Sequence, residues 1–393
     1  MMPIKVNKPK YLLNLLIIFV GVIIALIVGE ISIRIFFPSL CIISPENKLY
    51  IWPPNLRKIF KPMKGVMPGI SGPSRLHINS AGIRGDEFNK DQQHRILAIG
   101  GSTTECIYLD QVEAWPYRIQ QILNNDQKKV HVWVGNIGRS GFNTRDHIVV
   151  MRYIIPQYPR IDALLILLGI NDLVTGISQV PGRNKSEQET FLKVFGHVPG
   201  EKGSVLPFYK KTALYNLLRK FKVILVSAAL VQDKDGEFYM ELRRRRRNAS
   251  IIRNTLPDLS LALAEYAKNI NIMIDLAQKL KTRPVFITQP TIWRAGLPDK
   301  ANDLLWYGGI GNFQAERVKE YYSVEALADA MSMYNNTLLR VCEEREVECI
   351  DLASLLPKDT SVFYDDCHFH ENGAWLVAEA ISHYLLQREP FTD

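Results

Sequence analysis

Three polar residues of this chain have the types and spacing that nucleophilic catalysis needs. Ser102 follows two glycines directly after the apolar run Ile96-Leu97-Ala98-Ile99. Near the C-terminus, His368 lies three residues after Asp365. At this spacing a carboxylate can orient an imidazole and stabilise its protonated form, and the imidazole can take a proton from a serine. Ser102 would be a nucleophile if such a base lies within reach.

Each of these residues also has a structural alternative. The alternative for Ser102 is that it caps the next helix, since serine is a preferred N-cap. A phosphate-binding loop is weakly indicated, because neither Gly-Lys-Ser/Thr nor a dinucleotide fingerprint follows. Asp366 competes with Asp365 as the partner of His368, although spacing favours Asp365. The set Asp365, His368 and His370 could instead bind a metal, but we expect His370 to bond locally near a helix start, and we assign no metal.

Two further turns could supply hydrogen-bond donors to a developing oxyanion. Asn171 lies in Gly169-Ile170-Asn171-Asp172, after an apolar run, where an Asx turn is the alternative. A glycine in the segment 135–144 can present its backbone N–H to a cleft, and the alternative is a flexible turn. The sequence leaves Gly138 and Gly141 both open for this position.

The segments that must position these residues alternate between strand and helix patterns. Predicted strands cover 96–100, 131–136, 163–168, 284–288 and 347–352, and predicted helices cover about 114–125, 144–157, 259–280, 323–344 and 372–387. Strands separated by helices imply parallel βαβ units. Residues 173–283 interrupt the rhythm and are interpreted as an insertion at the carboxyl edge of the sheet. Residues 38–75, rich in Pro, Gly and Lys, are expected to be irregular.

In the order of its motifs, the chain resembles the SGNH, or GDSL-type, hydrolases. The resemblance rests on Gly-Gly-Ser-Thr-Thr at Ser102, the block with Gly141, Gly-Ile-Asn-Asp at Asn171, and the Asp365/His368 pair, and it covers about 95–176 and 284–388. It implies a three-layer α/β/α flavodoxin-like fold over 95–393 and a serine esterase or acyl-transfer mechanism.

The resemblance also implies roles for individual residues. Ser102 would be the nucleophile, His368 the general base and acid, and Asp365 the residue that orients His368. The oxyanion hole would consist of the Ser102 N–H, the Gly141 N–H and the Asn171 side chain. This chain departs from the family in having Gly-Gly-Ser where Gly-Asp-Ser is frequent, and Cys106 where a glycine is common.

The N-terminal region predicts a membrane helix. Residues 12–29 carry no charge, and about 20 apolar residues suffice to cross a bilayer. Lys5, Lys8 and Lys10 precede this stretch, which places residues 1–11 in the cytoplasm and the body outside. We therefore expect an uncleaved signal anchor over 12–36, followed by a linker and N-terminal extension over 37–94. A cleaved signal peptide and a buried core helix are the alternatives.

The composition of the chain indicates which classes of binding partner to expect. The 393 residues are 47% hydrophobic, with a net charge of +8. Part of the basic excess is the single run Arg243–Arg247, so no nucleic-acid footprint is indicated. The run is interpreted as a solvated helix face or, alternatively, as a contact for anionic lipid or acidic glycan. No cofactor is predicted, and the oligomeric state is left open.

The cysteines and the aromatic residues leave alternatives. The five cysteines include two possible disulfide pairs, Cys106/Cys367 and Cys342/Cys349, with free buried thiols as the alternative. Trp293, Trp306 and Tyr307 lie in predicted loops and could line a sugar-binding cleft. Trp115 is expected in the core.

Three functions fit this pattern. The first is a membrane-anchored serine ester hydrolase that acts on acyl or acetyl esters of a cell-surface glycan or lipid. The second is an O-acyltransferase for an exported polysaccharide, with the same residues. The third is a catalytically inactive, glycan-binding domain of the same fold. An ester assay with Ser102→Ala as control tests the first, and the acceptor that takes up the acyl group separates the first from the second. Failure of a serine-directed phosphonate to label Ser102 would favour the third.

Overall fold

The computed structural model divides the chain into two compact units. One unit comprises residues 1–48 and 199–233, and the other comprises 49–198 and 234–393. The structure describes residues 8–36, 48–125, 130–178, 186–195, 212–215, 217–218 and 236–392. The residues with predicted chemistry all belong to the second unit.

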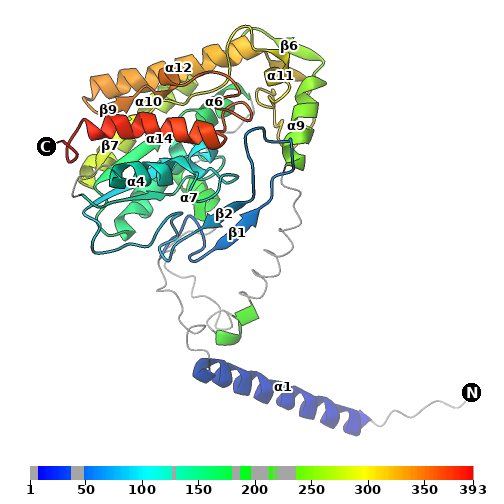
Figure 1. Cartoon of the computed structure of the whole chain (residues 1–393). Helices are drawn as coiled ribbons and strands as arrows, with labels where there is room; N and C mark the ends of the chain where they lie inside the picture. The colour runs from blue at the N-terminus through cyan, green and yellow to red at the C-terminus, as the bar shows by residue number, and fades with distance from the viewer. Residues whose placement is uncertain are drawn as a thin grey trace, which may run out of the picture. The chain divides into compact units, whose positions relative to one another are not determined.

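The second unit is built on a five-stranded parallel sheet (Figure 1). Its strands are β3 (His94–Gly100), β4 (Val132–Asn136), β5 (Ala163–Leu167), β7 (Arg283–Ile287) and β9 (Glu348–Ile350). They pair in the order β4-β3-β5-β7-β9, which is the 2-1-3-4-5 order of flavodoxin-like folds. Every residue of β5 is buried, as expected for a central strand covered on both faces. The predicted parallel α/β sheet is confirmed.

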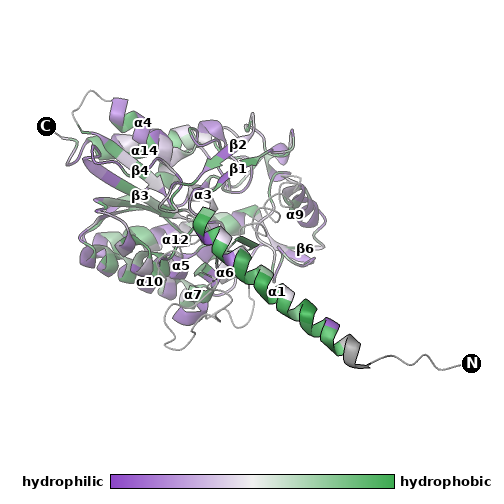
Figure 2. Ribbon diagram, turned by 90° about the horizontal axis from the view of Figure 1, so that it is seen from below, coloured by the Kyte–Doolittle hydropathy of each residue, from purple (hydrophilic) through white to green (hydrophobic). Residues whose placement is uncertain are grey.

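Helices cover both faces of the sheet (Figure 2). On one face α4 (Trp115–Asn125) packs against α14 (Glu371–Leu386). On the other face α10 (Ser260–Lys279) contacts both α5 (Thr144–Tyr153) and α12 (Val324–Glu344). The predicted three-layer architecture is therefore confirmed. The predicted helix over 144–157 ends earlier, and a 3₁₀ turn at Ile155–Gln157 follows it.

The carboxyl edge of the sheet gathers several short elements. There α3 (Ser102–Glu105) follows β3, α6 (Ile170–Ile177) follows β5, and α13 (Leu352–Leu355) follows β9. Reactive groups of α/β sheets collect at this edge. The elements outside the three layers are α7 (Glu187–Phe195), α9 (Glu237–Arg247), α11 (Asp299–Asn302) and the two-stranded sheet of β6 (Ile251–Arg253) with β8 (Glu320–Tyr322).

The N-terminal extension contributes to the second unit from Leu49 onward. It contains an antiparallel pair, β1 (Arg57–Phe60) with β2 (Ser74–His77). The prediction that 38–75 is irregular is wrong for these strands. A strand of four residues between prolines and glycines is too short to show a clear alternation of apolar and polar residues. Residues 37–47 lie outside the described part of the chain.

The first unit contains α1 (Lys8–Phe36). Its stretch Leu12–Phe36 is long and apolar enough to cross a membrane, and it is coloured as hydrophobic over most of its length (Figure 2). A signal sequence near the N-terminus satisfies the same criteria. Near the end of α1, the Glu30 carboxylate accepts hydrogen bonds from the N–H groups of Ala213 (2.8 Å) and Leu214 (2.9 Å).

Candidate active site

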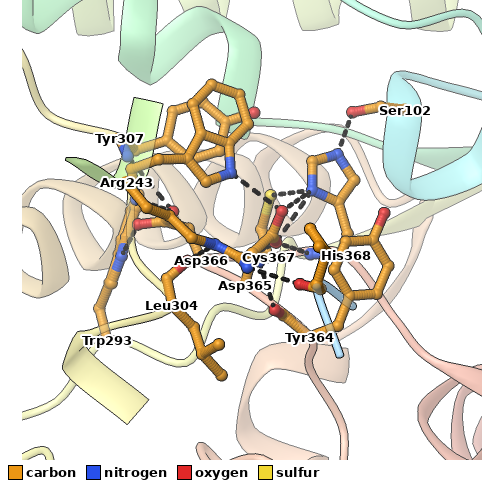
Figure 3. A network of polar contacts seen from close by, with 12 residues as sticks. Ser102, Arg243, Trp293, Leu304, Tyr307, Tyr364, Asp365, Asp366, Cys367 and His368 are labelled. Carbon is orange, nitrogen blue, oxygen red and sulfur yellow. Dashed lines mark hydrogen bonds and ion pairs between the residues drawn. The ribbon is translucent and has the colours of Figure 1, made fainter. Parts of the chain in front are cut away.

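The Ser102 hydroxyl and the His368 imidazole are in hydrogen-bond contact, although 266 residues separate them. Ser102 Oγ lies 2.7 Å from His368 Nε2 (Figure 3). Ser102 is the first residue of α3, whose N-cap is Gly101 and which has no side-chain cap hydrogen bond. The alternative that Ser102 caps this helix is therefore wrong, and its hydroxyl instead faces an imidazole.

The other ring nitrogen of His368 bonds Asp365. Nδ1 lies 2.7 Å from Asp365 Oδ2 and 2.9 Å from Oδ1, and Oδ1 also accepts the backbone N–H groups of Cys367 and His368. Burial alone would lower the pKa of His368, but the Asp365 carboxylate raises it well above 6.5. Burial would likewise raise the pKa of Asp365, but the charge and hydrogen bonds of His368 bring it below its usual value. The pair therefore favours an ionised carboxylate beside a basic imidazole.

Asp366 has different partners. Its Oδ1 accepts the indole N–H of Trp293 at 2.8 Å, and its Oδ2 accepts the backbone N–H groups of Trp306 (2.8 Å) and Tyr307 (3.2 Å). Burial and the neighbouring Asp365 raise the pKa of Asp366 to about 6. The competition between the two aspartates is thus resolved by geometry, because Asp365 faces the imidazole and Asp366 holds the loop at 306–307.

Aromatic side chains surround His368. The Tyr364 ring stacks on the imidazole at 5.6 Å between centroids, and the Tyr239 ring lies edge-on at 6.3 Å. The Trp306 indole N–H donates to Asp365 Oδ2 at 3.0 Å. Trp293, Trp306 and Tyr307 are all at least 97% buried, so they pack in the interior and do not offer a surface to a sugar in a cleft, which was the alternative from the sequence.

Trp115 lies in the core, as expected. It is fully buried, and its indole N–H donates to the carbonyl of Thr103 at 3.0 Å. It thereby supports α3, the helix that begins with Ser102.

Asn171 is placed beside the turn that carries Ser102. It is the second residue of α6, and its Nδ2 donates to the Phe142 carbonyl at 2.8 Å. A Cβ added to Gly101 would lie 2.5 Å from that nitrogen, so Gly101 permits the close approach. The amide carries two hydrogens, and the bond to Phe142 uses one of them. The side chain thus bridges two loops instead of forming a local Asx turn.

The structure distinguishes the two candidate glycines. A Cβ added to Gly138 would collide with the backbone of α3, whereas one added to Gly141 would meet nothing within 4 Å. Gly141 has φ +76° and lies in a turn closed by the bond from Phe142 N to Arg139 O at 3.1 Å. Of the two, Gly141 is the residue beside open space.

Glu105 connects this turn to α3. Its buried carboxylate accepts hydrogen bonds from the N–H (2.9 Å) and the hydroxyl of Ser140, and the Arg139 guanidinium lies 3.5 Å away. Burial raises the pKa of Glu105. Sequence reasoning missed this residue, and its only signal was an acidic side chain three positions after Ser102.

Arg84, from the N-terminal extension, holds the other end of α3. Its guanidinium donates to the carbonyls of Glu105 (2.5 Å), Cys106 (2.8 Å) and Leu109 (2.8 Å). Cys106 has φ +51°, a left-handed conformation that costs energy in a residue with a Cβ. The buried arginine therefore stabilises the loop that contains Cys106. Sequence reasoning missed Arg84 because nothing local marks it as buried.

The alternative metal set is wrong. His370 caps α14, because its Nδ1 accepts the N–H groups of Asn372 and Gly373 while its Nε2 lies 3.0 Å from the Thr360 carbonyl oxygen. This is the local bonding that the sequence predicted. Another group, Asp365, Cys367 and His368, has ligand atoms within 4.8 Å of one another. Both nitrogens of His368 are already engaged, however, with Asp365 and Ser102.

The five side chains of the arginine run differ in exposure, and Arg245 is intermediate. Arg243 and Arg246 are buried, whereas the side chains of Arg244 and Arg247 are 56% and 53% exposed. The interpretation as a solvated face is wrong for the first two, because their guanidinium groups bond backbone carbonyls of neighbouring loops.

The cysteines within the described part of the chain are all free thiols, so neither candidate disulfide is formed there. Cys41 lies outside the described residues.

A small cavity lies beside Ser102. Its volume is about 10 Å³, and its walls include Cys106, Tyr108, Leu109 and Tyr364. A space of this size holds about one water molecule.

No family model and no curated protein matches the chain. Among solved structures, a member of the lipolytic protein G-D-S-L family from Veillonella parvula matches with a TM-score of 0.39 and 12% identity, over 75% of this chain and 99% of that one. Axe2, an acetylxylan esterase from Geobacillus stearothermophilus, matches with a TM-score of 0.40 and 14% identity, over 74% and 94%.

A third match is the aryl esterase of M. smegmatis, with a TM-score of 0.39 and 10% identity, over 75% of this chain and 99% of that one. At these values the similarity assigns no activity to this chain.

Proposed function

We propose that this protein is a serine ester hydrolase that works through an acyl-enzyme. The observation that carries the proposal is the continuous relay from Ser102 Oγ to His368 Nε2 (2.7 Å) and from His368 Nδ1 to Asp365 Oδ2 (2.7 Å). In the first step His368 takes the Ser102 proton as Oγ bonds the ester carbonyl carbon, and the protonated imidazole then gives that proton to the departing alcohol. In the second step His368 takes a proton from water as the oxygen of that water bonds the acyl carbon, and the imidazolium then returns the proton to Ser102 Oγ as the bond from Oγ to the acyl carbon breaks and the acid is released.

Three donors are proposed for the oxyanion that forms in each step. They are the backbone N–H groups of Ser102 and Gly141 and the side-chain amide of Asn171. The proposal is supported by the position of the Asn171 amide against Gly101 and by the open space beside Gly141. Such donors stabilise the transition state because they are aimed in advance at the oxygen where charge develops.

The substrate is proposed to be an acyl ester of a cell-surface glycan or lipid. The small size of the cavity beside Ser102 supports a preference for short acyl groups over long ones. The helix Leu12–Phe36 is proposed to be an uncleaved signal anchor, with the N-terminus in the cytoplasm and the catalytic unit outside. A phosphatase reporter that is active only outside the cytoplasm, fused after Asp393, should be active, and an inactive reporter would contradict this orientation.

The activity is tested with the full chain in detergent on 4-nitrophenyl acetate, butyrate and octanoate. We expect the acetate to react fastest and Ser102→Ala to lower kcat by at least about 10³-fold. The exposed Ser354, changed to Ala, is the matched control and should leave kcat unchanged. A fluorophosphonate should add its mass to the wild type and not to Ser102→Ala. Equal activity of Ser102→Ala and wild type would remove the assignment.

A further inference from the structure

One face of α9 is buried against the loops of the candidate site. Tyr239, Leu242, Arg243 and Arg246 recur at helical spacing and are all buried. Arg243 is only 5% exposed. An arginine is rarely buried to this extent unless its donors are satisfied. We therefore expect Arg243 to hydrogen-bond specific groups in the interior.

The Arg243 guanidinium connects three segments that are distant in the sequence (Figure 3). Nη1 donates to the Val66 carbonyl at 2.5 Å, Nε to the Leu304 carbonyl at 2.9 Å, and Nη2 to the Tyr364 carbonyl at 3.0 Å. A guanidinium presents its donors in one rigid plane, so it fixes these carbonyls relative to each other. The ammonium of lysine is a single point with no such plane.

Two of these carbonyls, those of Tyr364 and Leu304, belong to segments that position Asp365. Tyr364 directly precedes Asp365 in the chain. Leu304 lies two residues before Trp306, whose indole N–H donates to Asp365 Oδ2. Arg243 thus holds both the backbone that carries the carboxylate and the loop that hydrogen-bonds it.

We propose that Arg243 is a positioning residue for the relay of Ser102, His368 and Asp365. By fixing the Tyr364 and Leu304 carbonyls together, it keeps the Asp365 carboxylate in contact with His368 Nδ1. The expected effect on rate rests on the proposed function, whereas the effect on His368 itself does not.

The test compares Arg243→Met and Arg243→Lys with Arg244→Met in the full chain. Arg244 is the matched control, because it lies on the same helix and its side chain is exposed and pairs with Glu241 of that helix. Arg243→Met should lower kcat on 4-nitrophenyl acetate about 10- to 100-fold, because small displacements of a catalytic group have effects of this size. KM should change by less than about twofold, since no substrate contact is lost. Arg244→Met should change neither.

The second readout is the titration of His368, followed by NMR of ¹⁵N-histidine-labelled protein and assigned with His368→Gln. A carboxylate that is no longer held against the imidazole raises its pKa less. The pKa of His368 should therefore fall in Arg243→Met and stay unchanged in Arg244→Met. If circular dichroism shows that Arg243→Met does not fold, Arg243→Lys decides, because it keeps the charge and one hydrogen bond.

Folded Arg243 variants with unchanged kcat and an unchanged His368 titration would overturn the proposal, as would equal losses in Arg244→Met. Failure of the proposed function gives a different pattern. Ester hydrolysis would then be insensitive to Ser102→Ala, while the His368 titration would still respond to Arg243→Met.

Discussion

The Trp306 indole nitrogen lies 3.0 Å from Asp365 Oδ2, the carboxylate oxygen that also bonds His368 Nδ1. The other oxygen accepts two backbone N–H groups, so this buried carboxylate is surrounded by donors. Donors of this kind stabilise the ionised form and offset the cost of burial. The loop that carries Trp306 therefore contributes directly to the electrostatics of His368.

Trp306→Phe removes the indole N–H and keeps an aromatic ring in the same space. We expect Asp365 to lose one charge-assisted hydrogen bond, worth about 1.5–3 kcal/mol, and kcat to fall about tenfold in consequence. The acid limb of the pH–rate profile should move to lower pH, because a less firmly held carboxylate raises the pKa of His368 less. Profiles of kcat/KM against pH test this, and superimposable wild-type and Trp306→Phe profiles would contradict it.

Asn171→Ala tests the proposed oxyanion hole. Loss of one such donor costs about 10²- to 10³-fold in kcat, with little change in KM, because the bond forms chiefly in the transition state. Steady-state kinetics on 4-nitrophenyl acetate measure both constants. Asn336, which is exposed on α12, is the matched control and should tolerate the same change. A rise in KM alone would assign Asn171 to ground-state binding instead.

Glu105→Ala tests the connection between α3 and the turn at Gly141. It leaves the Ser140 N–H and hydroxyl without their shared acceptor. A hydrogen bond to a charged group contributes about 1.5–3 kcal/mol of unfolding free energy, and water at the exposed Ser140 should offset part of this loss. Glu105→Gln retains one acceptor oxygen and should lose less. Urea unfolding measures the free energies of unfolding, and kcat should fall more in Glu105→Ala than in Glu105→Gln. A variant that loses stability but keeps full kcat would show that Glu105 does not position the turn at Gly141 for catalysis.

The pH dependence of the rate follows from the pKa shift of His368. The imidazole acts as a base only when neutral, and its pKa lies well above 6.5, because the Asp365 carboxylate outweighs burial. The rate should therefore rise with pH along a limb that lies above pH 6.5. Asp365→Asn removes the charge, so the limb should move to lower pH and kcat should fall about 10⁴-fold. A limb that stays in place would show that another group controls the rate.

The same pair makes stability depend on pH in two directions. A raised His368 pKa contributes stability that is complete below pH 6.5 and is lost as the pH rises through the folded-state pKa. A lowered Asp365 pKa contributes stability that is present above pH 3.8 and is lost as the pH falls through its folded-state pKa. The pair should therefore stabilise the folded state most between pH 3.8 and pH 6.5. Unfolding of His368→Gln and wild type, compared across pH, measures the difference.

Local patterns were sufficient to predict the sheet and its helices. Apolar runs such as Ala163–Leu167 mark buried strands, since a parallel strand covered on both faces has no polar side. The helices between them follow from the same alternation. The turn after β3 could also be predicted, because Gly100 and Gly101 have no Cβ and so allow neighbouring side chains to approach the backbone closely.

The sequence by itself determined which residue types end the strands, and so which side chains could meet at the carboxyl edge: Ser102, Asn171 and the Asp365/His368 pair. Only the tertiary structure decided which glycine borders open space, which aspartate faces the imidazole, and that Arg84, Glu105 and Arg243 are buried. The reason is that a charged side chain is buried only where distant backbone groups satisfy its hydrogen bonds. Folding brings these partners together, as it does the carbonyls of Val66, Leu304 and Tyr364 around Arg243. The sequence around a charged residue therefore does not show whether that residue will be buried.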